Sequence, residues 1–373
     1  MNHSKNIYAV IMTDLVHAKN NFDFLRVFAA SLVIISHSFP ILGLVEPNYS
    51  NLITLGSLGV YIFFIINGFL ITQSWDINNN PITFLWKRVL RIFPGLIFAA
   101  FVVTFILGIM VTTLSILDYL KEIQTYRFLF LAMFFPYWNI IPLDILPGVF
   151  KENPMPFVNG PLWTLVYEWC MYLLILGLGI MGVIKKKLFP ALILLTIFII
   201  YFYEMYVVQI HFFDSQLNIF LPLFLLFFIS SRLYFHNRIK KFSATLFFLS
   251  LIIIVLGSFT NYFLIFLIIT LPYIVLFIAH YPIPKLNKFG TIGDFSYGLY
   301  IFAWPVQQTI LVFFNDIQIG VHILCSFLLT IPIAYISWHF VESKALSHKN
   351  DVYDIDSLKI KVFKLRERIK NHF

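Results

Sequence analysis

Long apolar runs follow one another along almost the whole chain, and short polar segments separate them. An apolar run of about twenty residues can cross a bilayer as a helix, which satisfies its own backbone hydrogen bonds. The pattern therefore predicts an all-α polytopic membrane protein with about ten transmembrane helices. The predicted spans are residues 24–43, 55–74, 89–112, 161–184, 188–204, 218–233, 243–258, 262–280, 293–313 and 319–341.

The segment between the third and fourth predicted spans, residues 113–160, is a long outer loop. Within it Phe128–Pro136 is strongly apolar, but nine helical residues reach only about 14 Å, about half of what a span needs. We interpret it as an interfacial or re-entrant element. Tyr137, Trp138 and several prolines nearby suit an irregular interfacial segment. A loop this long is more often functional than incidental.

Lysine and arginine are distributed unevenly about the spans, which predicts the orientation of the protein. If the N-terminus is cytoplasmic, ten spans place both termini inside, with 23 of the 26 basic residues on the inner side. Lys121, Arg127 and Lys151 are then outside, in agreement with the positive-inside rule.

The same pattern divides the chain into three parts. They are a cytoplasmic N-terminal tail (1–21), a transmembrane domain (22–342) and a basic cytoplasmic C-terminal tail (343–373). Residues 357–370 of the C-terminal tail form either an amphipathic helix on the membrane surface or a solvated segment. We expect no cleavable signal peptide, because a polar lead of about twenty residues precedes the first span.

Charge and composition exclude several function classes. The net charge of +8 could indicate nucleic acid, but the basic residues lack the aromatic interleaving of a nucleic-acid groove, so we expect no such partner. Cys170 and Cys325 both fall in apolar segments, where buried thiols are more common than a disulfide or a metal site. No zinc-ligand spacing is present among the histidines, so we expect no metal.

Arg26 and His37 both lie in the first predicted span. Eleven helical residues turn through about 1100°, which is about 20° beyond three full turns, so the two side chains share one helix face roughly 16 Å apart. An ionisable residue in a membrane segment indicates a functional site. The alternatives are a His satisfied by a neighbouring helix, and an i,i+3 ion pair between Arg26 and Asp23.

Glu168 is a second candidate near the outer side. His37 lies roughly 9 Å below the outer end of its span and Glu168 roughly 10 Å below the start of the fourth, so they reach similar depths. A carboxylate beside an imidazole fixes its tautomer and raises its basicity, as a general base requires. The alternative is that Glu168 is interfacial and solvated.

On the inner side, Arg88 and Arg91 are i,i+3 neighbours near the start of the third span. Two guanidinium groups suit bidentate recognition of phosphate, although ordinary positive-inside anchoring explains them too. Ser296, Tyr297 and Tyr300 open the ninth span and could line a polar cavity or form part of an interfacial aromatic belt. Asn67 gives the second span one polar contact within a segment that favours close helix packing.

Taken together, these residues resemble the membrane acyltransferase-3 family, which typically O-acetylates bacterial envelope carbohydrates. The family's Arg-x10-His and Arg-x-x-Arg elements match Arg26 with His37 and Arg88 with Arg91. Its Gly-Val-x-x-Phe-Phe-x-x-Ser-Gly-Phe segment is similar to Gly59–Phe69, and its Trp-Ser-Leu-x-x-Glu element is similar to Trp163–Glu168. Its late Ser-Tyr-x-x-Tyr-x-x-His-x-Pro element matches residues 296–305, but Ala303 replaces the His.

The resemblance, which covers residue 21 to about 342, implies a multi-pass protein of the bacterial cytoplasmic membrane. Acetyl-CoA or a related acyl-CoA would be the donor, loaded from the cytoplasm, and an envelope glycan or lipid-linked sugar would be the acceptor. The implied roles are catalysis for His37 and Glu168; donor binding for Arg26, Arg88, Arg91, Ser296, Tyr297 and Tyr300; and acceptor binding for Trp163 and Asn67.

Two mechanisms remain open at His37: a general base for direct transfer, or a transient acyl carrier. A different class, a transporter or flippase of a lipid-linked saccharide, is the alternative function. Transporters of this class typically contain internal repeats and broken central helices, and the sequence shows no clear repeat.

Overall fold

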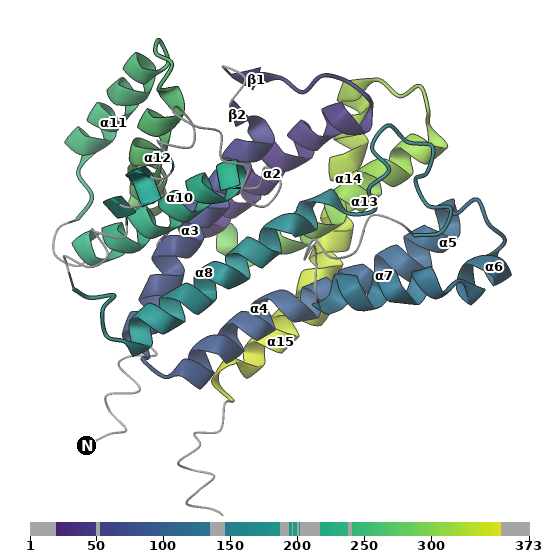
Figure 1. The fold of residues 1–373 in the computed structure, drawn as a ribbon, viewed down its shortest axis with the longest axis horizontal. Helices are drawn as coiled ribbons and strands as arrows, with labels where there is room; N and C mark the ends of the chain where they lie inside the picture. Colours follow the sequence, from purple (N-terminus) through teal and green to yellow (C-terminus); the bar gives the residue numbers. More distant parts are fainter. Residues whose placement is uncertain are drawn as a thin grey trace, which may run out of the picture.

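The computed structural model describes residues 20–49, 53–134, 146–186, 194–195, 197–199, 201, 217–237 and 241–351. Most of each predicted tail and most of the predicted span 188–204 lie outside these residues, as do Tyr137 and Trp138 of the outer loop. Helices dominate the described part, which confirms the all-α fold (Figure 1). A two-stranded antiparallel hairpin joins β1 (Asn48–Tyr49) to β2 (Ile53–Thr54).

Seven helices among the described residues are long and apolar enough to cross a membrane. They are α2 (Phe22–Ile41), α3 (Leu55–Ile77), Pro81–Val111, Gly160–Ile180, α10 (Leu217–Asn237), α12 (Phe263–His280) and Ile319–Asn350. Pro81–Val111 comprises α4 (Pro81–Val102), the π-helical turn η1 (Val103–Leu107) and α5 (Gly108–Val111). Gly160–Ile180 comprises the 3-10 turn η2 (Gly160–Leu162) and α8 (Trp163–Ile180). Ile319–Asn350 comprises α14 (Ile319–Ser337), the π-helical turn η4 (Trp338–Glu342), α15 (Ser343–Ser347) and η5 (His348–Asn350).

Two further predicted spans are helical but fall outside these seven. Helix α11 (Ala244–Gly257) has only 14 residues. Helix α13 (Ser296–Phe313) is long enough, but it carries several polar side chains. Nine of the ten predicted spans thus coincide with helices in the described chain, while the number of crossings and the orientation stay predictions.

Helix α13 lies inside the bundle, which explains its polar composition. Fourteen of its eighteen residues are buried, and it packs against α2, α4 and α14. A helix that other helices surround does not need a lipid-facing apolar surface, so polar side chains can sit on it wherever they find partners.

Local sequence signals set the helix starts near the site. Thr54 caps α3 by accepting a hydrogen bond from the Ser57 backbone N–H, and Asn80 caps α4 ahead of Pro81 in the first turn. The loop before α13 contains the 3-10 turn η3 (Phe289–Ile292).

Glycines allow the central helices to approach closely. A Cβ at Gly59 would lie 2.5 Å from the Ala29 carbonyl oxygen. At Gly68 it would lie within clashing distance of the Phe227 carbonyl oxygen, so α3 packs directly on α2 and α10 at these positions.

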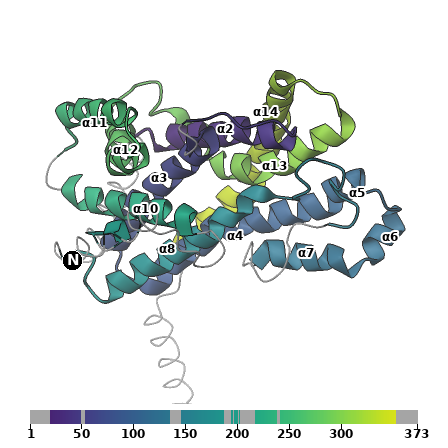
Figure 2. The same cartoon turned by 45° about the horizontal axis from the view of Figure 1, so that its top comes forward.

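The outer loop contains two short helices, α6 (Ile116–Lys121) and α7 (Ile123–Phe134). In both ribbon views α7 runs back beside α4 (Figures 1 and 2). Phe128 and Ala132 are buried in one cluster with Ala100 and Val103, while Phe130 is exposed. Twelve residues are too few for a span, so this arrangement agrees with an interfacial or re-entrant element.

Candidate functional site

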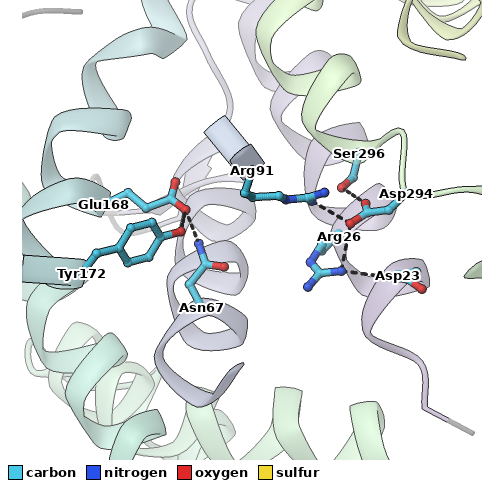
Figure 3. A network of polar contacts seen from close by, with 8 residues as sticks. All are labelled: Asp23, Arg26, Asn67, Arg91, Glu168, Tyr172, Asp294 and Ser296. Carbon is cyan, nitrogen blue, oxygen red and sulfur yellow. Dashed lines mark hydrogen bonds and ion pairs between the residues drawn. The ribbon is translucent and has the colours of Figure 1, made fainter. Parts of the chain in front are cut away.

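Five side chains form an ionic cluster, the Asp294 cluster, where α2, α4 and the loop before α13 meet (Figure 3). Arg91 Nη2 donates to Asp294 Oδ2 at 2.6 Å, and Arg26 Nη1 donates to the same oxygen at 3.1 Å. Ser296 Oγ donates to Asp294 Oδ1 at 2.5 Å. Arg26 also pairs with Asp23 Oδ1 at 2.7 Å, which confirms the local ion pair that the sequence offered as one explanation of Arg26.

The Asp294 cluster is largely removed from solvent and is matched in charge. The side chains of Arg26, Arg91 and Asp294 are 17%, 23% and 13% exposed. Asp294 lies before the first turn of α13, and the guanidinium groups of Arg91 and Arg26 balance its charge there.

Glu168 belongs to a second cluster on the other side of Arg91 (Figure 3). Its Oε1 accepts a hydrogen bond from Asn67 Nδ2 at 2.9 Å and another from the Tyr172 hydroxyl. The pairing of Glu168 with His37, which their similar predicted depths suggested, is not found in the described structure, because the carboxylate bonds α3 and its own helix instead.

The depth of Glu168 explains this correction. Gly160, at the start of η2, packs against the ring of Trp304, where a Cβ would approach ring carbons to 3.2 Å. The His37 ring contacts the same Trp304. The chain therefore enters α8 at the depth of His37 rather than at the bilayer surface. Glu168 lies five residues beyond Trp163, roughly 8 Å deeper.

Arg88 differs from the other two arginines because no carboxylate contacts it in the described structure. Its Nη2 donates to Ser74 Oγ at 3.1 Å, and its guanidinium lies 5.6 Å from the Phe84 ring centroid and 5.8 Å from that of Tyr172. Its Nε is buried without a hydrogen-bond partner among the described residues. Arg88 is thus the one of the three arginines whose charge no carboxylate balances in the described structure, which leaves it available to an anionic ligand.

His37 occupies the opposite part of α2. The helix is continuous from Phe22 to Ile41, which confirms the shared face of Arg26 and His37. The His37 ring packs edge-to-face on Trp304, with centroids 4.9 Å apart, and Trp304 Nε1 donates to the Phe157 carbonyl at 2.8 Å. Nδ1 of His37 is buried without a partner in the described chain.

The other predicted site residues lie between these two ends. Tyr297 donates its hydroxyl to the Ile92 carbonyl at 3.0 Å. Tyr300 donates to the Pro161 carbonyl at 3.0 Å and contacts Thr164 Oγ1 at 2.8 Å. Trp163 packs against Tyr167 at 5.5 Å. Tyr300 therefore joins α13 to η2 and α8, whereas Trp163 contacts a ring of its own helix, and neither belongs to the Asp294 cluster.

Ala303, which stands at the family's late His position, is fully buried. It packs with Ala30, Ile34, Leu299 and Ala334 between α2, α13 and α14. Ala303 therefore has a packing role in this chain. Of the two histidine positions in the family motifs, only the one in the first span, His37, is a histidine here.

Sequence reasoning assigned no role to Asp294, Tyr172 or Glu342. Asp294 is brought to the arginines only by tertiary packing. Tyr172 could have been found, since it lies one helical turn after Glu168. Glu342 is buried in the π-helical turn η4, where Oε1 accepts from Ser337 Oγ at 2.7 Å and Oε2 has no partner in the described chain.

The fold and the buried ionisable groups define a multi-pass membrane protein with two separate polar sites along one helix. The family profile of an acyltransferase domain, acyltransferase-3, matches residues 19–339, so the chain belongs to this family and is a membrane acyltransferase. A protein from Shigella phage Sf6 described as an O-acetyl transferase is 25% identical over 356 residues, covering 91% of this chain and 100% of that protein. Nodulation protein 10 of Rhizobium leguminosarum bv. viciae is 35% identical over 162 residues, 42% of each chain. No solved structure matches the chain.

Proposed function

We propose that this acyltransferase moves an acetyl group from acetyl-CoA to a hydroxyl of a cell-envelope carbohydrate. The O-linked acetyl product follows the resemblance to the O-acetyl transferase of Shigella phage Sf6, which this chain matches along its length. The carbohydrate acceptor follows what the acyltransferase-3 family typically modifies. The family identification favours a transfer reaction over the transport of a lipid-linked saccharide.

The donor end is proposed to be the end of the bundle that carries Arg26, Arg88 and Arg91. Basic residues concentrate there, and by the positive-inside rule this end faces the cytoplasm, where acetyl-CoA is made. Arg88 has free donors beside two aromatic rings, a setting that suits phosphate or the adenine ring. Arg91 and Arg26 supply further cationic surface that Asp294 holds in place.

His37 is the proposed reacting group, and the observation that carries the proposal is its position. It lies eleven residues beyond Arg26 on one continuous helix, so a ligand with an anchored nucleotide needs to extend about 16 Å to reach it. A buried imidazole whose Nδ1 has no partner among the described residues is free to bond a reacting atom.

Two reaction courses are compatible with this placement. In direct transfer, His37 accepts the proton of the sugar hydroxyl while the hydroxyl oxygen attacks the thioester carbon. The carbon–sulfur bond breaks, and the CoA thiolate takes the proton from the imidazolium. In the two-step course, a His37 nitrogen attacks the thioester carbon and the carbon–sulfur bond breaks; the CoA thiolate takes the remaining ring proton and leaves as the thiol. The sugar oxygen then attacks the acyl-imidazole, the carbon–nitrogen bond breaks, and the released imidazole takes the hydroxyl proton.

The test is His37→Ala in purified protein reconstituted into lipid. We expect loss of acetyl transfer from radiolabelled acetyl-CoA to an envelope glycan extract, while membrane insertion and thermal unfolding remain as in the wild type. Retained transfer would overturn the role of His37. Trapping of an acyl-imidazole after acid quench would select the two-step course, and a ternary-complex rate law without such a species would select direct transfer.

A further inference from the structure

The outer part of α13 carries a group of buried polar atoms that the proposed chemistry does not use. Gln307 and His322 are both fully buried. Gln307 lies on α13, one turn after Ala303, and His322 lies in the first turn of α14. Gln307, His322 and His37 belong to three different helices and lie at a similar depth in the bundle.

Hydrogen bonds join these residues to the helix of His37. Gln307 Nε2 donates to the Ile34 carbonyl at 2.8 Å and to Ser38 Oγ at 2.7 Å, and Ser38 is the neighbour of His37. His322 Nε2 donates to the backbone carbonyl of Gln307 at 3.1 Å. His37 itself packs on Trp304, three residues before Gln307 on α13.

Each of the three residues has one buried atom left without a partner in the described chain: Gln307 Oε1, His322 Nδ1 and His37 Nδ1. The Gln307 amide nitrogen faces two oxygen atoms, so Oε1 is fixed as an acceptor. A carbonyl can only accept, so His322 Nε2 carries the proton and Nδ1 of the neutral ring is a second bare acceptor.

Buried acceptors without donors destabilise a protein, by about 1–3 kcal/mol each. They are satisfied when a ligand brings hydroxyl or amide protons. A phosphate or carboxylate at neutral pH brings acceptors and would be repelled, whereas a sugar carries several hydroxyl donors in a small volume. The unpaired set therefore selects for a polyol.

From this chemistry we propose that Gln307 and His322 bind hydroxyl groups of the carbohydrate acceptor and so hold one hydroxyl beside His37. The inference rests on the proposed function, which it deepens by naming acceptor-binding residues. Asn67, one of the acceptor residues implied by the family resemblance, bonds Glu168 instead. The outer loop contacts α13 at the next residue, where Asn153 Nδ2 donates to Gln308 Oε1 at 2.7 Å and Gln308 Nε2 donates to the Phe157 carbonyl.

The experiment compares His322→Phe and Gln307→Met with the wild type, each in lipid nanodiscs. Two quantities are measured: the apparent KM for a total envelope glycan extract of the source cells, and the dissociation constant for CoA. We expect the glycan KM to rise about three- to tenfold, as for the loss of one neutral hydrogen bond, while CoA binding does not change.

Two control variants match the helices and the depth. Ser326→Ala removes a buried hydroxyl of α14 that bonds only its own helix, at the His322 carbonyl. Thr309→Val removes a hydroxyl of α13 that bonds the Pro305 carbonyl. Both should keep the glycan KM of the wild type.

The outcomes separate this proposal from the function it rests on. An unchanged glycan KM in either test variant that folds overturns the assignment of that residue, and an equal loss of CoA binding assigns it a structural role instead. If the wild type transfers no acetyl group to the extract although it binds CoA, the proposed function itself fails. If His322→Phe does not fold, Gln307→Met and His322→Gln carry the test.

Discussion

Arg91 Nη2 lies 2.6 Å from Asp294 Oδ2, and this ion pair joins α4 to the loop that precedes α13. Arg26 reaches the same carboxylate oxygen from α2. One acidic side chain therefore ties together the three elements that form the basic end of the bundle, and two of its three arginines are already neutralised before any donor arrives.

The unequal pairing of the arginines gives the first prediction. Arg88→Gln should weaken CoA binding with little change in thermal stability, because Arg88 bonds no carboxylate in the described chain. Arg91→Gln should lower the free energy of unfolding by about 1–3 kcal/mol, because Asp294 loses one charged hydrogen-bond partner and keeps Arg26. Calorimetric CoA titration and thermal unfolding measure the two effects. Asp316→Asn, at an exposed loop position, is the control, and equal behaviour of both arginine variants would contradict the distinction.

Glu168 should act on the donor end rather than on His37. Its carboxylate bonds Asn67 and Tyr172, so Glu168→Gln should leave the midpoint of the pH–rate profile in place while lowering kcat/KM for acetyl-CoA. Tyr172→Phe removes one of the same hydrogen bonds and should have a smaller effect of the same kind. A shifted midpoint in Glu168→Gln would show that the carboxylate does tune the imidazole.

Gly68 should be intolerant of any side chain. A Cβ there would clash with the Phe227 backbone, which cannot move aside as a flexible side chain would. Gly68→Ala should therefore destabilise the protein by roughly 1–3 kcal/mol through overpacking. Gly177→Ala on α8 has no atom within 4 Å of the new Cβ and should be neutral or stabilising by up to about 1 kcal/mol. Thermal unfolding of the pair in one detergent is the measurement, and similar losses would contradict this prediction.

Glu46, in the loop between α2 and α3, should make the stability of the folded protein depend on pH. Its carboxylate accepts a hydrogen bond from Ser36, and burial raises its pKa above the usual value. The folded protein then holds this proton more tightly than the unfolded chain, so the contribution to stability is full below about pH 4 and is lost as the pH rises through the raised pKa.

Glu46→Gln replaces the carboxylate with a neutral group of the same shape. We expect the melting temperature of the wild type to fall relative to the variant as the pH is raised from about 4 to about 7. Parallel melting curves across this range would show that Glu46 does not titrate in a buried setting.

The helices could be predicted from the sequence, but their depths could not. Apolar runs marked nine helices because length and hydropathy are local properties, and the Asp23–Arg26 pair was visible because its partners are one turn apart. The depth of Glu168 was misjudged because it was counted from the start of an apolar run. The chain in fact enters α8 through η2, already beneath Trp304. Asp294 and Gln307 acquire their roles only when distant helices meet, and no spacing along the chain marks that meeting.

The shared carboxylate of Asp294 has a consequence for how the donor is captured from solution. Arg26 and Arg91 carry two positive charges and Asp23 and Asp294 two negative ones, so this group adds almost nothing to the long-range field. The long-range attraction of an anionic donor then comes from exposed lysines at the same end, such as Lys186, Lys344 and Lys349. Added salt screens such exposed charges over about 8–10 Å, so ionic strength should slow donor capture while leaving the buried arginines undisturbed.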